Sequence, residues 1–88
     1  IGIVIVGTNE KQWLQRAFST IFDNDFQGRL EVLYVDNNSQ DGSVEFVRTH
    51  FPSVHILVSD RNLGYSGANN KGIDQALSLN VDYVFLLN

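Results

Sequence analysis

The sequence predicts an α/β fold in which a parallel sheet carries helices on both faces. Short apolar runs rich in β-branched residues alternate with longer segments in which apolar residues recur at helical spacing. The strand-like runs are almost continuously apolar, as expected of strands that are buried on both faces. Strict alternation of the two kinds of segment indicates a Rossmann-like sheet of order β-α-β-α-β-α-β.

Each element has its own local signal. The predicted elements are strand 1–6, helix 10–23, strand 30–35, helix 43–50, strand 54–58, helix 66–79 and strand 83–87. Asn9, followed three residues later by Gln12, resembles a capping box that opens the first helix. Pro52 ends the second helix, because the residue before a proline is pushed out of the helical region.

Glycines and small residues define the third helix. Glycine inside a helix costs about 1 kcal/mol relative to alanine. We therefore expect a packing reason for Gly72 and an unusual backbone angle at Gly64. The predicted packed face of this helix consists of Ala68, Gly72, Ile73, Ala76 and Leu77.

Composition excludes several classes of protein. Six Lys and Arg against ten Asp and Glu give a net charge of −4, and the basic residues do not cluster, which disfavours nucleic-acid binding. The chain has no Cys, so disulfides and thiolate zinc sites are excluded. No apolar run approaches the roughly 18 residues that cross a bilayer, so we expect no membrane segment in this piece. We interpret residues 1–88 as a single domain.

Polar residues gather where the predicted strands end. The four groups are Gly7-Thr8-Asn9, Asp36-Asn37-Asn38, Ser59-Asp60-Arg61 and Asn88. Ligands of parallel α/β sheets bind beyond the carboxyl ends of the strands. The sequence therefore predicts the functional site at this edge.

A dinucleotide-binding domain is one alternative, because Asp36 ends the second strand where such domains hold a ribose. Their first turn reads Gly-x-Gly-x-x-Gly, so that the backbone can approach a pyrophosphate. The turn here contains only Gly7, which disfavours this alternative.

Four motifs in order extend over almost the whole chain. They are Ile3-Val4-Ile5-Val6-Gly7-Thr8-Asn9, then Val35-Asp36-Asn37-Asn38-Ser39-Gln40-Asp41-Gly42-Ser43, then Arg61-Asn62-Leu63-Gly64-Tyr65-Ser66-Gly67-Ala68-Asn69-Asn70-Lys71-Gly72-Ile73, and Phe85-Leu86-Leu87-Asn88. Their order and spacing resemble the start of a family 2 glycosyltransferase of the rhamnosyl- and galactosyl-transferase type. That resemblance implies an inverting, metal-dependent enzyme with the GT-A fold, active in polysaccharide or glycan biosynthesis. Residues 1–88 would be its amino-terminal, nucleotide-sugar-binding half.

The resemblance implies a nucleotide site made of Thr8, Asn9, Asp36, Asn38, Arg61 and Gly64. The family aspartate that matches Asp36 accepts a hydrogen bond from the base, and an ionised carboxylate can pair with the imide of uracil or thymine or with guanine. We expect a UDP or dTDP sugar, with GDP also open. Thr8 stands where the family has a tyrosine, so base stacking is lost there. Arg61 either faces ribose or diphosphate or is a solvated loop residue.

The remaining expectations concern metal, catalysis and helix capping. The resemblance matches Asn88 to the first position of a motif that binds Mg²⁺ or Mn²⁺ in the full-length enzyme, and the metal-binding aspartate would lie beyond it. We expect no metal and no sugar transfer in the 88-residue piece alone. The residues themselves predict that Asp41 caps the second helix.

Two further expectations concern location and association. Both ends of the chain fall beside apolar strands, which favours a piece of a longer protein, and the resemblance implies the cytoplasm or the inner face of a membrane. A rival hypothesis is a non-catalytic fragment that self-associates. Its exposed fourth strand, Tyr83 to Leu87, would pair with a neighbour.

Overall fold

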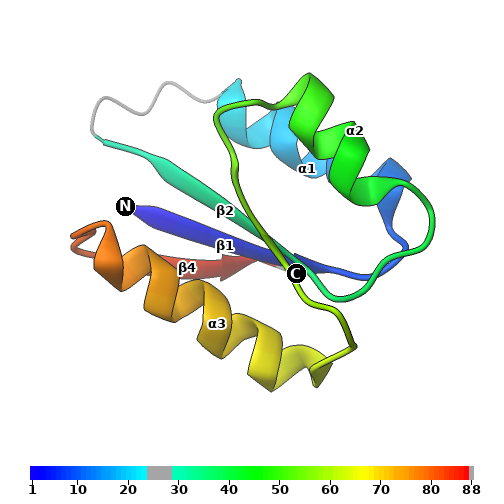
Figure 1. The fold of residues 1–88 in the computed structure, drawn as a ribbon. Coiled ribbons are helices and arrows are strands. Elements are labelled where there is room, and N and C mark those ends of the chain that lie inside the picture. The colour runs from blue at the N-terminus through cyan, green and yellow to red at the C-terminus, as the bar shows by residue number, and fades with distance from the viewer. Residues whose placement is uncertain (24–28, 88) are drawn as a thin grey trace.

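The computed structural model describes residues 1–23 and 29–87, and these residues have the predicted order of elements (Figure 1). The elements are β1 (Gly2–Gly7), α1 (Lys11–Phe22), β2 (Glu31–Asp36), α2 (Ser43–His50), β3 (His55–Val58), α3 (Gly64–Ser78) and β4 (Val84–Leu87). Most boundaries lie within one or two residues of the predicted ones. The four strands form one parallel sheet of order β3-β2-β1-β4.

The sheet has one helical layer on each face, as predicted. Figure 1 shows α1 and α2 together on one side and α3 on the other. Ile5 and Tyr34 pack with α1 and α2, whereas Val4 and Val35 pack with α3. Since neighbouring residues of a strand point to opposite faces, β1 and β2 serve two cores at once and must be apolar throughout.

Close contact between α3 and the sheet depends on Gly72. A Cβ atom at this position would lie 2.4 Å from Cγ1 of Val4 and 3.1 Å from Cγ2 of Val35. The predicted packing reason for this glycine is therefore confirmed. The predicted packed face of α3 is wrong at Leu77, which is 57% exposed, because Ala76 already occupies the sheet-facing position.

The capping box predicted at the start of α1 is wrong. Glu10 is the N-cap residue, and its own side chain makes no capping hydrogen bond. Asn9 instead adopts a left-handed conformation with φ of 55° and turns its side chain toward the loop after β2. α3 begins at Gly64, two residues earlier than predicted, and Gly64 has a φ of 74°. The unusual backbone angle expected of Gly64 is thus confirmed.

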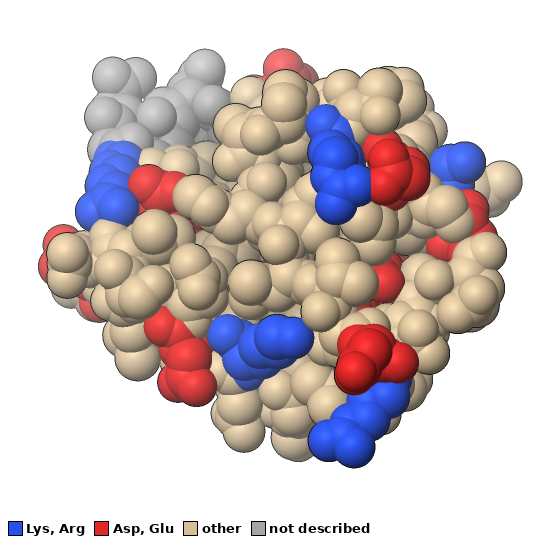
Figure 2. Space-filling view, viewed as in Figure 1, with Lys and Arg blue, Asp and Glu red and all other residues tan. Residues whose placement is uncertain are grey.

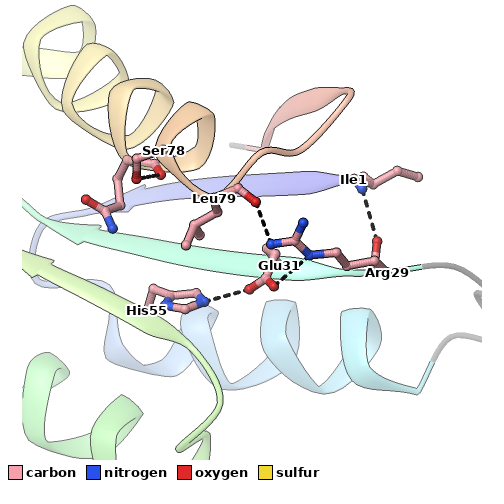
Figure 3. A network of polar contacts seen from close by, with 7 residues as sticks. Ile1, Arg29, Glu31, His55, Ser78 and Leu79 are labelled. Carbon is pink, nitrogen blue, oxygen red and sulfur yellow. Dashed lines mark hydrogen bonds and ion pairs between the residues drawn. The ribbon is translucent and has the colours of Figure 1, made fainter.

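A polar network links the amino ends of the strands (Figure 3). Glu31 pairs with Nε2 of His55 at 2.6 Å and with Nε of Arg29 at 3.0 Å. Arg29 also donates to the carbonyl of Leu79 at 2.5 Å. The pKa of Glu31 lies below its ordinary value. The hydrogen bond with His55 is the largest cause, and the hydrogen bond with Arg29 is the next. This network lies at the end of the sheet opposite the predicted site.

β4 is an edge strand of the described sheet, since it pairs only with β1. Its apolar side chains remain open to solvent, with Phe85 at 56% and Leu87 at 40% exposure. These two residues are in register with Ile3 and Ile5, which face α1 and α2. Neither Phe85 nor Leu87 belongs to the core beneath α1 and α2, so the described residues leave this part of the apolar sheet face exposed.

Charge is dispersed on the visible face of the molecule. In Figure 2 the Lys and Arg side chains stand apart from one another, with Asp and Glu among them. Within the described part of the chain, no helix is long and apolar enough to cross a membrane.

Candidate functional site

A cleft of about 330 Å³ opens at the carboxyl ends of β1 and β2. One wall is the end of β1 with the turn that follows it, and the other is the loop before α3 with the first residues of that helix. The lining residues are Val6, Gly7, Thr8, Glu10, Asn37, Asn62, Gly64 and Tyr65. The structure therefore places the cleft at the edge of the sheet that the sequence predicted, and it brings Thr8 and Gly64 together there.

Asp36 does not line this cleft. Val32 and Tyr34 face α1 and α2, and Asp36 continues that alternation, which carries its side chain to the same face. The carboxylate is 1% exposed, and both of its oxygens accept hydrogen bonds from the chain. The Tyr34 hydroxyl donates to Oδ1 at 2.5 Å, and the backbone N–H of Ser39 donates to Oδ2 at 2.9 Å. In this arrangement Asp36 orders the loop that follows β2.

The Tyr34 side chain has a second structural effect. Burial, and then the hydrogen bond to Asp36, raise the pKa of the Tyr34 phenol well above its ordinary value. A Cβ atom at Gly7 would lie 3.1 Å from Cε1 of this ring, so Gly7 leaves the space that the ring occupies. The glycine of the first turn therefore has a packing reason in Tyr34.

Asn37 faces the cleft, because it is one residue further along the strand and points toward α3. Its amide oxygen accepts the backbone N–H of Leu63 at 2.7 Å. Its Nδ2 donates to Oδ1 of Asn62 at 2.9 Å and to the carbonyl of Gly64 at 3.3 Å. The Thr8 hydroxyl donates to the Asn37 carbonyl at 3.4 Å. Asn37 thus contacts both walls.

Asp41 caps α2 as predicted, and it also binds α1. Its Oδ1 accepts the backbone N–H of Ser43 at 3.0 Å as well as the Ser43 hydroxyl. Its Oδ2 accepts the backbone N–H of Lys11 at 3.2 Å. The hydrogen bond from the Ser43 side chain is the main cause that lowers the pKa of Asp41. One carboxylate therefore satisfies an orphan N–H group at the start of each of two helices.

The turns after β1 and β2 are joined by two more contacts. The Asn9 amide oxygen accepts the Gln40 N–H at 2.7 Å, and the Asn9 N–H donates to the Ser39 hydroxyl at 2.9 Å. The predicted site residues Asn9 and Asn38 are exposed and do not line the cleft. Both adopt left-handed backbone conformations, with φ of 55° and 66°. The structure places them in the loop framework around the cleft.

Arg61 lies in a different hollow, beside the end of β3. This open hollow of about 640 Å³ is lined by Val58, Ser59, Asp60, Arg61, Leu63 and Lys71. Lys71 donates to the buried Ser59 hydroxyl at 3.3 Å and to the Val58 carbonyl at 3.4 Å. Arg61 is exposed and follows Asp60 in the loop. This position is compatible with a contact to ribose or diphosphate and with a solvated loop arginine.

Sequence reasoning missed Asn37 and Asn62 as residues of the cleft. Both stand within the quoted motifs, each beside a charged residue, Asp36 and Arg61, that the resemblance favoured as the site residue. The period of two along β2 offered a signal, since Leu33, Val35 and Asn37 share one face. Sequence alone did not say which face the cleft would occupy.

The resemblance implies a metal in the full-length enzyme, and the described residues supply no complete site for one. Residues 1–23 and 29–87 contain no group of three or more His, Cys, Asp or Glu side chains that could hold a metal ion. Asn88, the predicted metal-adjoining position, lies outside the described residues. Within this range the donor set does not fit Mg²⁺ or Mn²⁺, so a metal would need ligands other than these residues.

Comparison with known proteins identifies the family. Residues 2–88 match the family described as glycosyl transferase family 2. The chain belongs to glycosyltransferase family 2. It is 32% identical over 80 residues to the glycosyltransferase AglE of Haloferax volcanii, a match that covers 86% of this chain and 26% of AglE.

A solved structure supports the same assignment of fold. The family 2 chain is similar, with a TM-score of 0.75 and 25% identity, to the mannosyltransferase PcManGT from Pyrobaculum calidifontis in complex with GDP-Man and Mn²⁺. That match covers 84% of the chain and 23% of the mannosyltransferase. The sheet order and alternating helices match the amino-terminal part of a GT-A domain. The chain therefore spans about a quarter of the length of these relatives.

Proposed function

We propose that residues 1–88 form the nucleotide-binding part of a glycosyltransferase that moves a sugar from a nucleoside-diphosphate donor to an acceptor hydroxyl. The single observation that carries this proposal is the cleft between Thr8 and Gly64, at the carboxyl edge of a parallel sheet in a family 2 chain. Such edges are where nucleotides bind in α/β folds. We extend the proposal to inversion at the sugar and to polysaccharide or glycan synthesis, on the resemblance alone.

The cleft is suited to a base and ribose. Its wall offers the Thr8 hydroxyl, backbone groups near Gly64 and the half-exposed ring of Tyr65. Direct contact between Asp36 and the base stays a prediction. It would require the surrounding loop to move, because Asp36 is buried and does not line the cleft. The GDP-mannose named with the related mannosyltransferase supports a guanosine donor, so GDP joins UDP and dTDP as a candidate of equal standing.

Catalytic groups belong to the remainder of the enzyme in this proposal. The Mn²⁺ in the related mannosyltransferase supports a divalent metal in the full-length protein, where it would act as a Lewis acid on the diphosphate. The 88-residue chain alone is proposed to bind nucleotide without transferring sugar. Its location would be the cytoplasm or the inner face of a membrane, where nucleotide sugars are supplied.

An NMR titration of the isotope-labelled chain tests this function. We would add GDP, UDP and dTDP separately, each with and without Mg²⁺. Saturable shifts at Thr8, Gly64 and Tyr65 with one nucleotide are the expected result. Thr8→Val should weaken that binding about fivefold through the lost hydroxyl, whereas the exposed control Thr49→Val should not. A folded sample that responds to none of the nucleotides would contradict the proposal, and sugar transfer by this chain would contradict its inactivity.

A self-associating fragment is the second candidate, favoured by the uncovered apolar residues of β4. Phe85 and Leu87 are 56% and 40% exposed on a strand that pairs only with β1. Open strand edges pair readily with other chains. Sedimentation should then show dimers that Phe85→Lys abolishes, and a clean monomer at high concentration would count against this candidate.

A further inference from the structure

The two walls of the cleft come from distant parts of the chain, and Asn37 joins them. Its backbone N–H donates to the Gly7 carbonyl at 2.9 Å, and its carbonyl accepts the Thr8 hydroxyl. Its side chain hydrogen-bonds to the opposite wall, at Asn62, Leu63 and Gly64. Asn37 is 3% exposed, so these contacts are sheltered from water and hold the two walls at a fixed separation.

The start of α3 depends on these contacts. The first N–H groups of a helix have no partner within the helix, and α3 has no side-chain cap of its own at Leu63. Asn37 accepts the Leu63 N–H at 2.7 Å, and Asn62 accepts the Gly64 N–H at 2.7 Å. Gly64 stands in a left-handed conformation with φ of 74°. An asparagine directly after β2 thus fixes the backbone at which α3 begins.

The chemistry of the side chain is specific to an amide. Both hydrogens of Nδ2 are used, on Oδ1 of Asn62 and on the Gly64 carbonyl, while Oδ1 accepts from Leu63. A carboxylate of the same size keeps the acceptor and loses both donors. The carboxylate would place a charged oxygen against two other oxygens, that of the Asn62 amide and that of the Gly64 carbonyl. Neither oxygen can donate a hydrogen bond, so the contacts would become repulsive.

We propose that Asn37 is the positioning residue of the cleft. Its amide sets the place of Gly64 and Tyr65 relative to Thr8, and so sets the space into which a nucleoside base fits. Both Nδ2 donors of Asn37 are already used within the protein. Asn37 therefore affects a ligand through the position of Gly64 and Tyr65, and not by direct contact. This inference rests on the proposed nucleotide-binding function for its ligand, but its structural part can be measured without any ligand.

The first measurement is amide hydrogen exchange on the ligand-free chain. Asn37→Asp keeps the size of the side chain and removes the two donors. Asn62→Ala, at an exposed position, removes one of their two acceptors and the acceptor of the Gly64 N–H. Both should speed exchange of the Leu63 and Gly64 amides about tenfold relative to core strands. Asn70→Asp, an exposed asparagine on α3, is the control for charge and should leave these amides unchanged.

The second measurement is nucleotide affinity in the same folded samples. We expect Asn37→Asp and Asn62→Ala to weaken binding about tenfold, and Asn70→Asp to bind as the parent does. Uncharged guanosine and uridine, titrated beside GDP and UDP, separate loss of geometry from repulsion of the diphosphate. Lowering the pH protonates the new carboxyl of Asn37→Asp and restores one donor. Affinity relative to the parent should then recover in that variant and not in Asn62→Ala, which a merely destabilised fold would not produce.

The outcomes are distinguishable. Unchanged exchange at Leu63 and Gly64 in both variants would overturn the positioning role, whatever the nucleotide does. Faster exchange with parent-like affinity would also overturn it. If Asn37→Asp fails to fold, Asn62→Ala decides the matter. A parent chain that binds no nucleotide would refute the proposed function, while the exchange data still judge the contact between Asn37 and α3.

Discussion

Gly72→Ala is the substitution for which the structure gives the clearest expectation. α3 crosses the sheet with Gly72 directly above Val4 and Val35, both fully buried. The added Cβ would be 2.4 Å from Cγ1 of Val4 and 3.1 Å from Cγ2 of Val35. Carbon atoms in good contact are about 3.5–4.0 Å apart, so α3 would have to retreat by roughly 1 Å or the valines leave their rotamers.

Two effects of opposite sign decide how much Gly72→Ala changes the free energy of unfolding. Alanine is the better helix former by about 1 kcal/mol, which favours the variant. Overpacking of a well-filled core costs about 1–3 kcal/mol, and the upper end applies because β1 and β2 are the two central strands of the sheet. The net expectation is a loss of about 1–2 kcal/mol. The free energy of unfolding of a domain of this size is roughly 5–10 kcal/mol, so a change of this size is readily measured.

Urea denaturation followed by circular dichroism is the assay. The midpoint for Gly72→Ala should fall with the slope unchanged. Asn70→Ala is the control, since it changes helix propensity at an exposed position of the same helix and should be neutral or slightly stabilising. Adding Val4→Ala to Gly72→Ala removes Cγ1, so the double variant should be more stable than the sum of the single effects predicts. A midpoint for Gly72→Ala at or above that of the parent would refute the packing argument.

Two other predictions concern the polar contacts. Asp41→Ala leaves the Lys11 and Ser43 N–H groups without their acceptor and should lower the free energy of unfolding by about 1 kcal/mol, as measured by urea denaturation; no change would show that water replaces the carboxylate. The pKa of Glu31 is lowered in the folded state, so its carboxylate stabilises the fold above its ordinary pKa of 4.5 and loses that effect as the pH falls further. The urea midpoint should therefore fall less between pH 5 and pH 3 in Glu31→Gln than in the parent. An equal fall in the parent and the variant would exclude a contribution of Glu31 to acid sensitivity.

Local patterns were sufficient for the order of elements. Continuous β-branched runs in β1 and β2 indicate strands covered on both faces, and the structure places a helical layer on each. The cap at Asp41 was also predictable, because Asp41 lies two residues before the Ser43 that it caps. The positive φ at Gly64 was predictable because glycine is the residue that adopts it at no steric cost. The capping box at Asn9 failed because a distant loop, at Gln40, competes for the same side chain.

The sequence by itself determined the fold class, the edge of the sheet that carries the cleft and the family. Each of these depends on the period of the pattern, on short-range turn chemistry or on motif order. Only the tertiary structure decided which side chains face the cleft. Asp36 and Asn37 are neighbours and both are buried, yet alternation turns Asp36 to the face of α1 and α2 and Asn37 toward the start of α3. That choice depends on which helix covers which face of the sheet, a relation between distant segments that no local pattern contains.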